Sequence, residues 1–428
     1  MTGIKKLVLF CTKPVCVTVH CFAKQLICWL VLSTVCTQLA AQTEFDSLKR
    51  NSNLDTSYQP SSKPTFTTEF AEVKISGFIQ PALYYDVNNV LNSDIFVTSE
   101  IPTTKITHIN FQRFHMSANQ SRLGFSFKFP KAGKNTTAVL EGDFLSSTKG
   151  LNTYFRLRHA YLTNGEFLVG QTWTNFGDIG ASPNTLDLEG PNSMPSSRVA
   201  QIRWRRQMTK GFNLLLAVEE PKGDYTALDS ANTLRAAFPE LVIKPKFSFN
   251  NGHWSNSFIY KPIVYSDKNY SFKKKLNAWG FTSSLSINIP DSKSSHWSGI
   301  KNRVFNIFGI IGKGTQGAVN DFGGLGYEAV PKDGTSLETL SYYGGYVSYS
   351  FVIKKRWSTT YVYSYLHQEK PAITNAIFRQ SHYFAANAVY AFNKYFTLGA
   401  EILYGAKSNY DNTQGNALRL LSVMRLLF

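Results

Sequence analysis

Apolar and polar residues alternate one by one in many short runs of this chain. The run 416–428 is the clearest example, because Arg419 and Arg425 fall on one face of it. The other face carries the apolar residues Leu418, Leu420, Met424, Leu426 and Phe428. Successive side chains of a strand point to opposite sides. The pattern therefore predicts a strand with one apolar face and one charged face.

About sixteen runs of this kind follow Val73, and the gaps between them alternate between short and long. The runs lie at 73–86, 111–129, 136–146, 153–163, 166–174, 198–208, 211–220, 240–249, 254–265, 277–289, 302–312, 341–352, 356–367, 381–392, 395–405 and 416–428. The short gaps are four-residue turns at 163–166, 208–211, 250–253 and 392–395. The long gaps are polar segments at 87–110, 175–197, 221–239, 313–340 and 368–380.

An even number of strands with turns on one side and long loops on the other is typical of an outer-membrane barrel. We therefore expect an all-β fold, a transmembrane antiparallel barrel over 73–428 with short periplasmic turns and long extracellular loops. The run 277–289 supports this, with Trp279 and Phe281 on one face and Ser284 and Ser286 on the other. A final strand ending in Phe428, with no polar tail after it, is a further habit of such barrels. A barrel of this size leaves a water-filled channel.

The first 41 residues are typical of a secretory signal peptide. Lysines precede an apolar stretch at 26–41 that ends in small residues. A retained membrane helix is the alternative, although about sixteen apolar residues are fewer than the roughly 20 that a span needs. A lipoprotein signal ending at Cys36 is a second alternative. Residues 42–72 are rich in Ser, Thr, Asn and Pro without periodicity, which predicts a disordered segment.

Composition narrows the possible functions. All five cysteines lie in the leader, so we expect no disulfide, thiolate metal site or catalytic cysteine after it. The leader holds four lysines and no acidic residue, so the rest of the chain carries +13, four less than the +17 of the whole sequence. The arginines are spread through alternating strands, which argues against nucleic-acid binding. A cationic lumen that attracts anions explains the positive net charge better than nucleic-acid binding does.

Charged residues on the strand faces opposite the outward aromatic residues are expected to line the lumen. These pore-lining candidates are Arg122, Arg156, Arg158, Arg203, Arg205, Arg419 and Arg425, with Glu141 and Asp143 among them as carboxylates. Arginine suits anion recognition because its planar donor fork pairs with carboxylate or phosphate in two places and stays charged. The alternative is that these charges only solvate a water-filled wall. His159 is interpreted as an interfacial residue of the barrel.

Several segments in 115–206 resemble the DcaP-like family of outer-membrane porins, in the same order as in the family. They are Gln120–Phe125, Glu141–Phe144, Arg156–Tyr161, Val169–Trp173, Gly190–Asn192 and Gln201–Arg203. The resemblance implies a sixteen-stranded homotrimer in the outer membrane of a Gram-negative bacterium that favours small anions, especially dicarboxylates. It also implies that the loop 175–197 folds inward, with Asp187 and Glu189 among its polar candidates. The sequence departs from the family at Asn119, where a basic residue is common.

We therefore expect a porin for passive diffusion of small anionic solutes, embedded in outer-membrane lipid and working without a cofactor, metal or enzymatic activity. Two other classes stay open. One is a structural or adhesive barrel with a blocked lumen, and the other is an outer-membrane enzyme. Ion conductance of the purified protein separates the diffusion porin from these two alternatives.

Overall fold

The computed structural model describes the chain from residue 65 to Phe428. Within this range it leaves out residue 89 and the segments 104–111, 133–135, 146–153, 222, 227–232, 236–237, 267–272, 291–299, 334 and 374–376. The predicted signal peptide and most of the predicted disordered segment therefore lie outside the described residues. The exception is the short strand β1 (Thr65–Thr67), which pairs with residues 72–74 of the barrel although it falls within 42–72.

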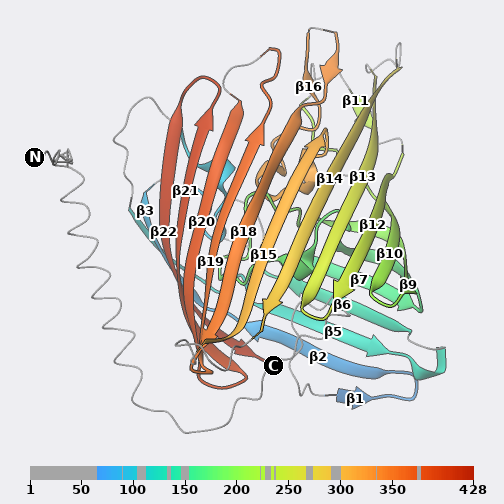
Figure 1. The fold of residues 1–428 in the computed structure, drawn as a ribbon, viewed down its shortest axis with the longest axis vertical. Helices are drawn as coiled ribbons and strands as arrows, with labels where there is room; N and C mark the ends of the chain where they lie inside the picture. Colours follow the sequence, from blue (N-terminus) through green and yellow to red (C-terminus); the bar gives the residue numbers. More distant parts are fainter. Residues whose placement is uncertain are drawn as a thin grey trace, which may run out of the picture. The chain divides into compact units, whose positions relative to one another are not determined.

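The described chain forms a closed antiparallel barrel of 16 strands, as the alternation predicts (Figure 1). Two of the sixteen are interrupted and consist of β2 with β3 and of β4 with β5. The strands are β2 (Glu72–Ile79), β3 (Ala82–Asn88), β4 (Arg113–Ser117), β5 (Arg122–Lys128), β6 (Thr137–Asp143), β7 (Arg156–Asn164), β8 (Phe167–Trp173), β9 (Arg198–Thr209), β10 (Phe212–Glu219), β12 (Glu240–Phe249), β13 (Gly252–Ser266), β14 (Lys273–Ile289), β15 (Ile300–Lys313), β18 (Ser341–Ile353), β19 (Trp357–Gln368), β20 (Phe378–Ala391), β21 (Phe396–Asn409) and β22 (Gln414–Leu427).

The interruption of the first strand lies at Gln80 and Pro81, because proline has no N–H to donate to a neighbouring strand. The adjacent strand is interrupted at the same height, between β4 and β5. The Ser121 hydroxyl accepts the Gln80 N–H at 3.0 Å and so replaces a ladder bond. The side chains of Gln80 and Gln120, both buried, are joined by a 2.6 Å hydrogen bond.

The barrel closes where β22 pairs with β2 and β3. At this seam Phe428 and Gly77 exchange two backbone hydrogen bonds of 3.1 Å. A Cβ atom on Gly77 would lie 2.2 Å from the backbone oxygen of Arg122 on β5. Glycine is therefore required at this position by the close approach of three strands.

The faces predicted for 277–289 and 416–428 are confirmed. On β14, Trp279 and Phe281 are exposed on the outside, whereas Ser284 and Ser286 are buried on the inside. On β22, Met424 and Leu426 are exposed, whereas Arg419 is buried. Polar side chains can face inward because the interior holds water and loop backbone, whereas the outside of a barrel meets lipid.

The turns are as short as predicted, and Gly165 and Gly211 occupy two of them with positive φ angles of 58° and 89°. The longer loops carry small elements. Strand β11 (Thr233–Arg235) pairs with β13, and β16 (Val330–Pro331) forms a hairpin with β17 (Leu337–Glu338). Single 3-10 turns occur at η2 (Thr98–Glu100), η3 (Pro130–Ala132), η4 (Ile179–Ala181), η5 (Gln316–Ala318) and η6 (Asn320–Phe322). In the described part of the chain, no helix is long and apolar enough to cross a membrane.

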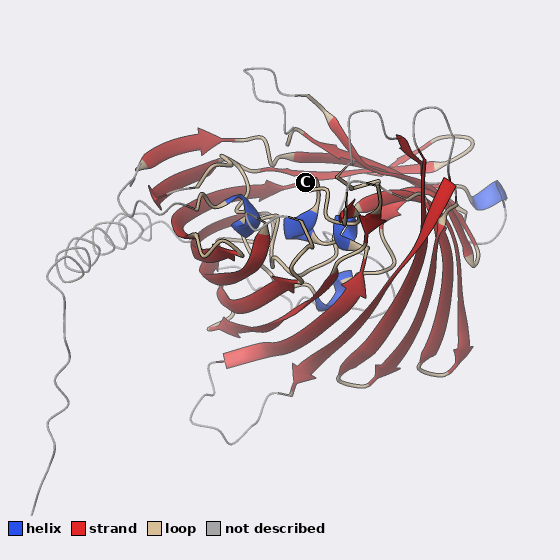
Figure 2. Ribbon diagram, turned by 90° about the horizontal axis from the view of Figure 1, so that it is seen from above, coloured by secondary structure: helices blue, strands red, loops and turns tan. Residues whose placement is uncertain are grey.

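Among the described residues, three loops enter the barrel, where the sequence indicated only one. They are the β3–β4 loop, the β8–β9 loop and the β15–β18 loop, and their 3-10 turns lie within the ring of strands in Figure 2. Apolar loop residues such as Phe176 and Phe322 pack with inward residues of the wall such as Tyr342 and Phe378. The β3–β4 loop packs in the same way through Phe96 and its neighbours. Part of the lumen is therefore filled by an apolar core.

Candidate functional site: an arginine-lined constriction

Five charged side chains form a ladder across the inner faces of β5, β6 and β7. Asp143 binds Arg156 through two hydrogen bonds of 2.9 and 2.8 Å and Arg158 through one of 2.7 Å. Glu141 accepts a 3.0 Å hydrogen bond from Arg158 and lies 3.4 Å from the Nε atom of Arg122. Three guanidinium groups thus share two carboxylates, which leaves one positive charge in excess.

A β-bulge in β7 adds the side chain of His159 to the five charged side chains of this wall. Glu141 pairs with His159 and Gly142 pairs with Leu157, so Arg158 is the extra residue of the bulge. As a result, both Arg158 and His159 point inward. The His159 ring is buried, lies 3.0 Å from the Thr172 hydroxyl and packs against Trp173. The interfacial position expected for His159 is therefore wrong, because a bulge shifts the alternation by one residue.

The β8–β9 loop, residues 174–197, is anchored first to the wall formed by β10, β13 and β14. Asn175 donates to Glu219 from its backbone at 2.7 Å and from its side chain at 2.6 Å. Asp178 receives a 2.6 Å hydrogen bond from Ser284 and lies 2.8 Å from the His253 Nε2 atom. Burial would raise the pKa of Asp178, but two nearby lysines and His253 hold it well below the usual value.

The same loop then crosses the lumen and is anchored to β19, β20 and β21. Glu401 accepts the backbone N–H groups of Leu186 and Asp187 at 2.9 and 2.7 Å. The Asn192 side chain donates to the Ser381 hydroxyl at 2.7 Å, and the adjacent Ser193 hydroxyl lies 2.8 Å from that of Ser364. Loop 174–197 therefore spans the interior from one wall to the other.

Buried acidic residues join this loop to the other two inward loops. Asp321 of the β15–β18 loop accepts hydrogen bonds from the Thr98 hydroxyl and from the Ser99 backbone, the latter at 2.8 Å. Asp187 accepts the Phe96 backbone N–H at 3.3 Å. Burial raises the pKa of Asp187 to about 6 and that of Asp321 to about 7.

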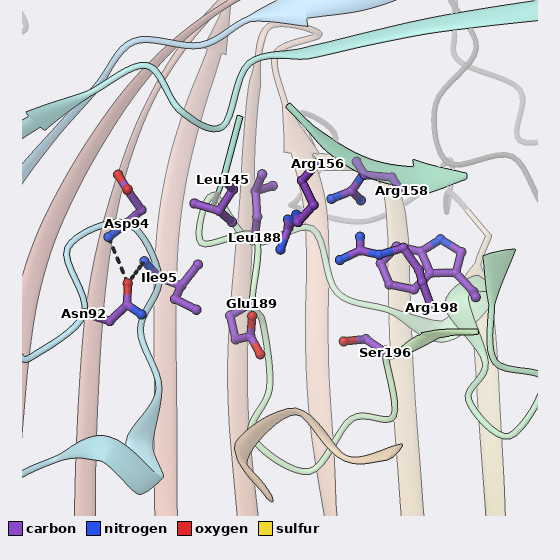
Figure 3. A pocket seen from close by; sticks show the side chains of 11 residues that line it. Asn92, Asp94, Ile95, Leu145, Arg156, Arg158, Leu188, Glu189, Ser196 and Arg198 are labelled. Atoms are coloured by element: carbon purple, nitrogen blue, oxygen red, sulfur yellow. Dashed lines mark hydrogen bonds between the residues drawn. The ribbon is translucent and has the colours of Figure 1, made fainter. Parts of the chain in front are cut away.

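A cavity of about 100 Å³ lies between loop 174–197 and the arginine wall (Figure 3). The side chains that line it are Asn92, Asp94, Ile95, Leu145, Arg156, Arg158, Trp173, Leu188, Glu189, Ser196 and Arg198. Figure 3 shows the guanidinium groups of Arg156, Arg158 and Arg198 pointing toward one space, with the Glu189 carboxyl facing them from the loop. Burial, together with Asp187 and Asp321, raises the pKa of Glu189 to about 8, so Glu189 is mostly neutral at pH 7.

The sequence profile of the family described as DcaP outer membrane protein matches residues 37–300, well over half of the chain. The chain belongs to this family. The matched range includes every residue that lines the cavity. No curated protein matches the chain. DcaP-family membership and the barrel together place the protein in the outer membrane as a porin channel.

Solved structures agree with the fold of this DcaP-family barrel. The outer membrane channel DcaP of Acinetobacter baumannii superimposes with a TM-score of 0.72 at 21% identity, covering 85% of this chain and 99% of that one. OmpF of Salmonella typhi, solved in complex with daunomycin, gives a TM-score of 0.51 at 11% identity, covering 85% and 100%. Identities this low show a shared fold and say nothing about the permeating solute.

The remaining predicted lining residues of this DcaP-family chain lie in several places. Arg203 is buried and donates to the Asn175 side chain at 3.2 Å, while Arg205 is exposed near the periplasmic end of β9. Arg425 donates to the Gln80 side chain at 2.6 Å. The buried Arg419 binds Asp86 at 2.6 Å and backbone oxygens of the β3–β4 loop, so it anchors that loop and does not line the cavity.

The two predicted loop acids also differ from each other. Asp187 is buried and takes part in anchoring the loop through the Tyr383 hydroxyl, 3.3 Å away, whereas Glu189 lines the cavity. Asn119, the departure from the family pattern, donates a 3.1 Å hydrogen bond to the Asp94 carboxylate. A neutral amide at this position therefore still satisfies an acid of the cavity.

Sequence reasoning missed Arg198 and Trp173, which lie at the two ends of loop 174–197. Alternation places Arg198 on the same face as the outward residue Ile202, because both positions are even. At the first residue of a strand, however, the side chain can turn over the rim. The available signal was that an arginine directly follows the loop expected to narrow the pore.

Proposed function

We propose that this porin favours small anions and passes dicarboxylates. The observation that carries the proposal is the convergence of Arg156, Arg158 and Arg198 on the cavity between the wall and loop 174–197. Of the two acids that line the same cavity, Glu189 is mostly neutral at pH 7, so three guanidinium groups face Asp94 as the one other acid of the described lining. A narrow passage with a surplus of fixed positive charge raises the local concentration of anions.

Two guanidinium groups in one small cavity favour a solute that carries two carboxylates. Each charged hydrogen bond adds affinity, but binding must stay weak enough for release into the periplasm. The apolar side chains Ile95, Leu145 and Leu188 line the opposite part of the cavity, where they can contact a hydrocarbon chain. These features support a short organic diacid as the solute.

Ion selectivity in a planar bilayer tests the proposal. In a salt gradient, the wild-type channel should show a reversal potential with the sign of an anion-selective pore, and succinate should block the current. The double variant Arg156→Gln/Arg158→Gln should shift the reversal potential toward cations. Arg205→Gln, which removes an inward arginine away from the cavity, is the matched control and should change little. A cation-selective wild-type channel would end the proposal.

A barrel with a blocked lumen is the second candidate function. The observation in its favour is that three loops enter the barrel and leave a cavity of only about 100 Å³ at the arginine wall. Such a protein would serve a structural or adhesive role. Absence of single-channel conductance in wild-type protein that is folded and inserted would favour this candidate.

We also propose that the protein assembles as a homotrimer. Strands β6 and β8 have 7 residues each, fewer than the 9–11 that a strand needs to cross a bilayer. Large apolar residues such as Phe114, Met116 and Leu162 are about 60% exposed on the outside of this short part of the wall. Contact with another protomer would cover them. Light scattering of the detergent-solubilised protein measures the mass, and a monomeric mass would contradict the proposal.

A further inference from the structure

The guanidinium of Arg198 differs from those of Arg156 and Arg158 because no carboxylate among the described residues is paired with it. Its central carbon lies 4.6 Å from the centre of the Trp173 ring, and its Nη1 atom is buried without a hydrogen-bond partner among the described residues. Arg198 also forms no ion pair in the described part of the chain. A buried cationic donor without a partner is costly, so such groups often mark the place of a ligand.

Arg156 and Arg158 are already compensated. Asp143 holds both of them, and Glu141 holds Arg158 a second time. An anion that binds Arg158 has to compete with two carboxylates at distances of 3.0 Å and below. Arg198 needs no such exchange, because its side chain lines the cavity and its Nη1 atom has no hydrogen-bond partner among the described residues.

Trp173 fixes the position of Arg198. The central guanidinium carbons of Arg198 and Arg158 lie 4.6 and 5.5 Å from the centre of the Trp173 ring. Stacking on an aromatic face stabilises a cation while leaving the edge of the guanidinium fork open. The fork is therefore presented to a solute at low entropic cost, as recognition of a planar carboxylate requires.

We propose that Arg198 is the primary anion contact of the constriction and binds one carboxylate of a permeating small organic acid, with Arg156 as the second, weaker contact. This inference rests on the proposed function and assigns its main contact to a residue outside the ladder. Trp173 acts as the positioning residue for Arg198. Leu188 and Leu145 border the same space, so the solute should be an organic acid and not an inorganic anion.

The test measures current block by succinate in single channels of four proteins: wild type, Arg198→Gln, Arg198→Lys and Arg156→Gln. Arg198→Gln loses a charged hydrogen bond and should therefore weaken the block about 10- to 100-fold. Arg198→Lys keeps the charge but loses the fork and should be intermediate. Arg156→Gln should weaken the block less than Arg198→Gln does. Inorganic phosphate, used as a second probe, should block the wild type more weakly than succinate.

A fifth variant separates positioning from charge. Trp173→Leu removes the stacking surface without changing the charge, so it should weaken the succinate block by a larger factor than it changes the anion selectivity in a potassium chloride gradient. If Arg198→Gln does not fold into a heat-modifiable barrel, Arg198→Lys and Trp173→Leu decide the question. Wild-type block in both of these variants would overturn the inference.

The two proposals fail in different ways. A wild-type channel that is cation-selective and not blocked by succinate would overturn the proposed function. A wild-type channel that is anion-selective and blocked, together with an unchanged block in Arg198→Gln, would overturn only the role of Arg198. A larger loss in Arg156→Gln than in Arg198→Gln would do the same.

Discussion

Ionisation of Glu189 should make the ion selectivity of this channel depend on pH. Because the pKa of Glu189 is raised to about 8, the side chain is neutral at pH 7 and negative at pH 9. Its carboxyl faces the three arginines across the cavity (Figure 3). The proposed anion preference should therefore be largest below pH 7.5 and should fall as the pH rises through 8.

Coulomb's law sets the size of this effect. A negative charge ~8 Å from a permeating anion costs it ~0.5 kcal/mol with the dielectric constant of water and ~2 kcal/mol with an effective value of about 20. These energies change the anion permeability by roughly two- to thirtyfold, since 1.4 kcal/mol corresponds to a factor of ten. A pore that contains some water should fall within this range.

The assay is the reversal potential in a potassium chloride gradient, measured between pH 6 and pH 9.5 on wild type and Glu189→Gln. The glutamine keeps the shape and cannot ionise, so this variant should lose the change centred near pH 8. Asp187 and Asp321 have pKa values of about 6 and 7, and both remain in the variant, so their titration cancels in the comparison. Equal pH profiles in the two proteins would refute the reasoning.

Three further predictions concern the barrel and its loop. Gly77→Ala should lower the yield of heat-modifiable barrel, because the new Cβ would meet backbone at 2.2 Å and overpacking costs about 1–3 kcal/mol; Gly309→Ala, with nothing within 4 Å, is the matched control and should fold normally. Deleting 182–192 should raise the single-channel conductance, and an unchanged value would mean that the loop does not narrow the path. Glu401→Ala leaves two buried N–H groups of the loop without a hydrogen-bond acceptor, which destabilises the docked loop by about 1–3 kcal/mol for each group. The loop should therefore be cut faster in limited proteolysis, and protection equal to that of the wild type would contradict the anchoring role of Glu401.

The strands could be predicted from the sequence because lipid on one side and polar lumen on the other impose a strict period of two. The positions of individual charges could not, because contacts between distant segments decide them. Arg419 has the same alternation as Arg156, yet the β3–β4 loop covers it and leaves Arg156 open. Likewise, no local pattern shows that Glu401 will anchor a loop more than 200 residues away.

The resemblance placed one loop in the lumen, and the structure places three there. The reason lies on the inner wall, where Leu421, Val423 and Leu403 face inward and are covered by the loops. In the sequence, such residues look like ordinary members of apolar runs. Their inward direction becomes informative only once the strand register is known.

The bulge at Arg158 has a consequence for how this channel can change over generations. One additional residue places Arg158 and His159 side by side on the inner wall, while Leu157 and Leu162 remain on the outside. Loss or gain of a single codon at this point would alter the chemistry of the passage and leave the surface that meets lipid as it was. The bulge thus allows the residues that line the passage to change in evolution independently of the residues that face lipid.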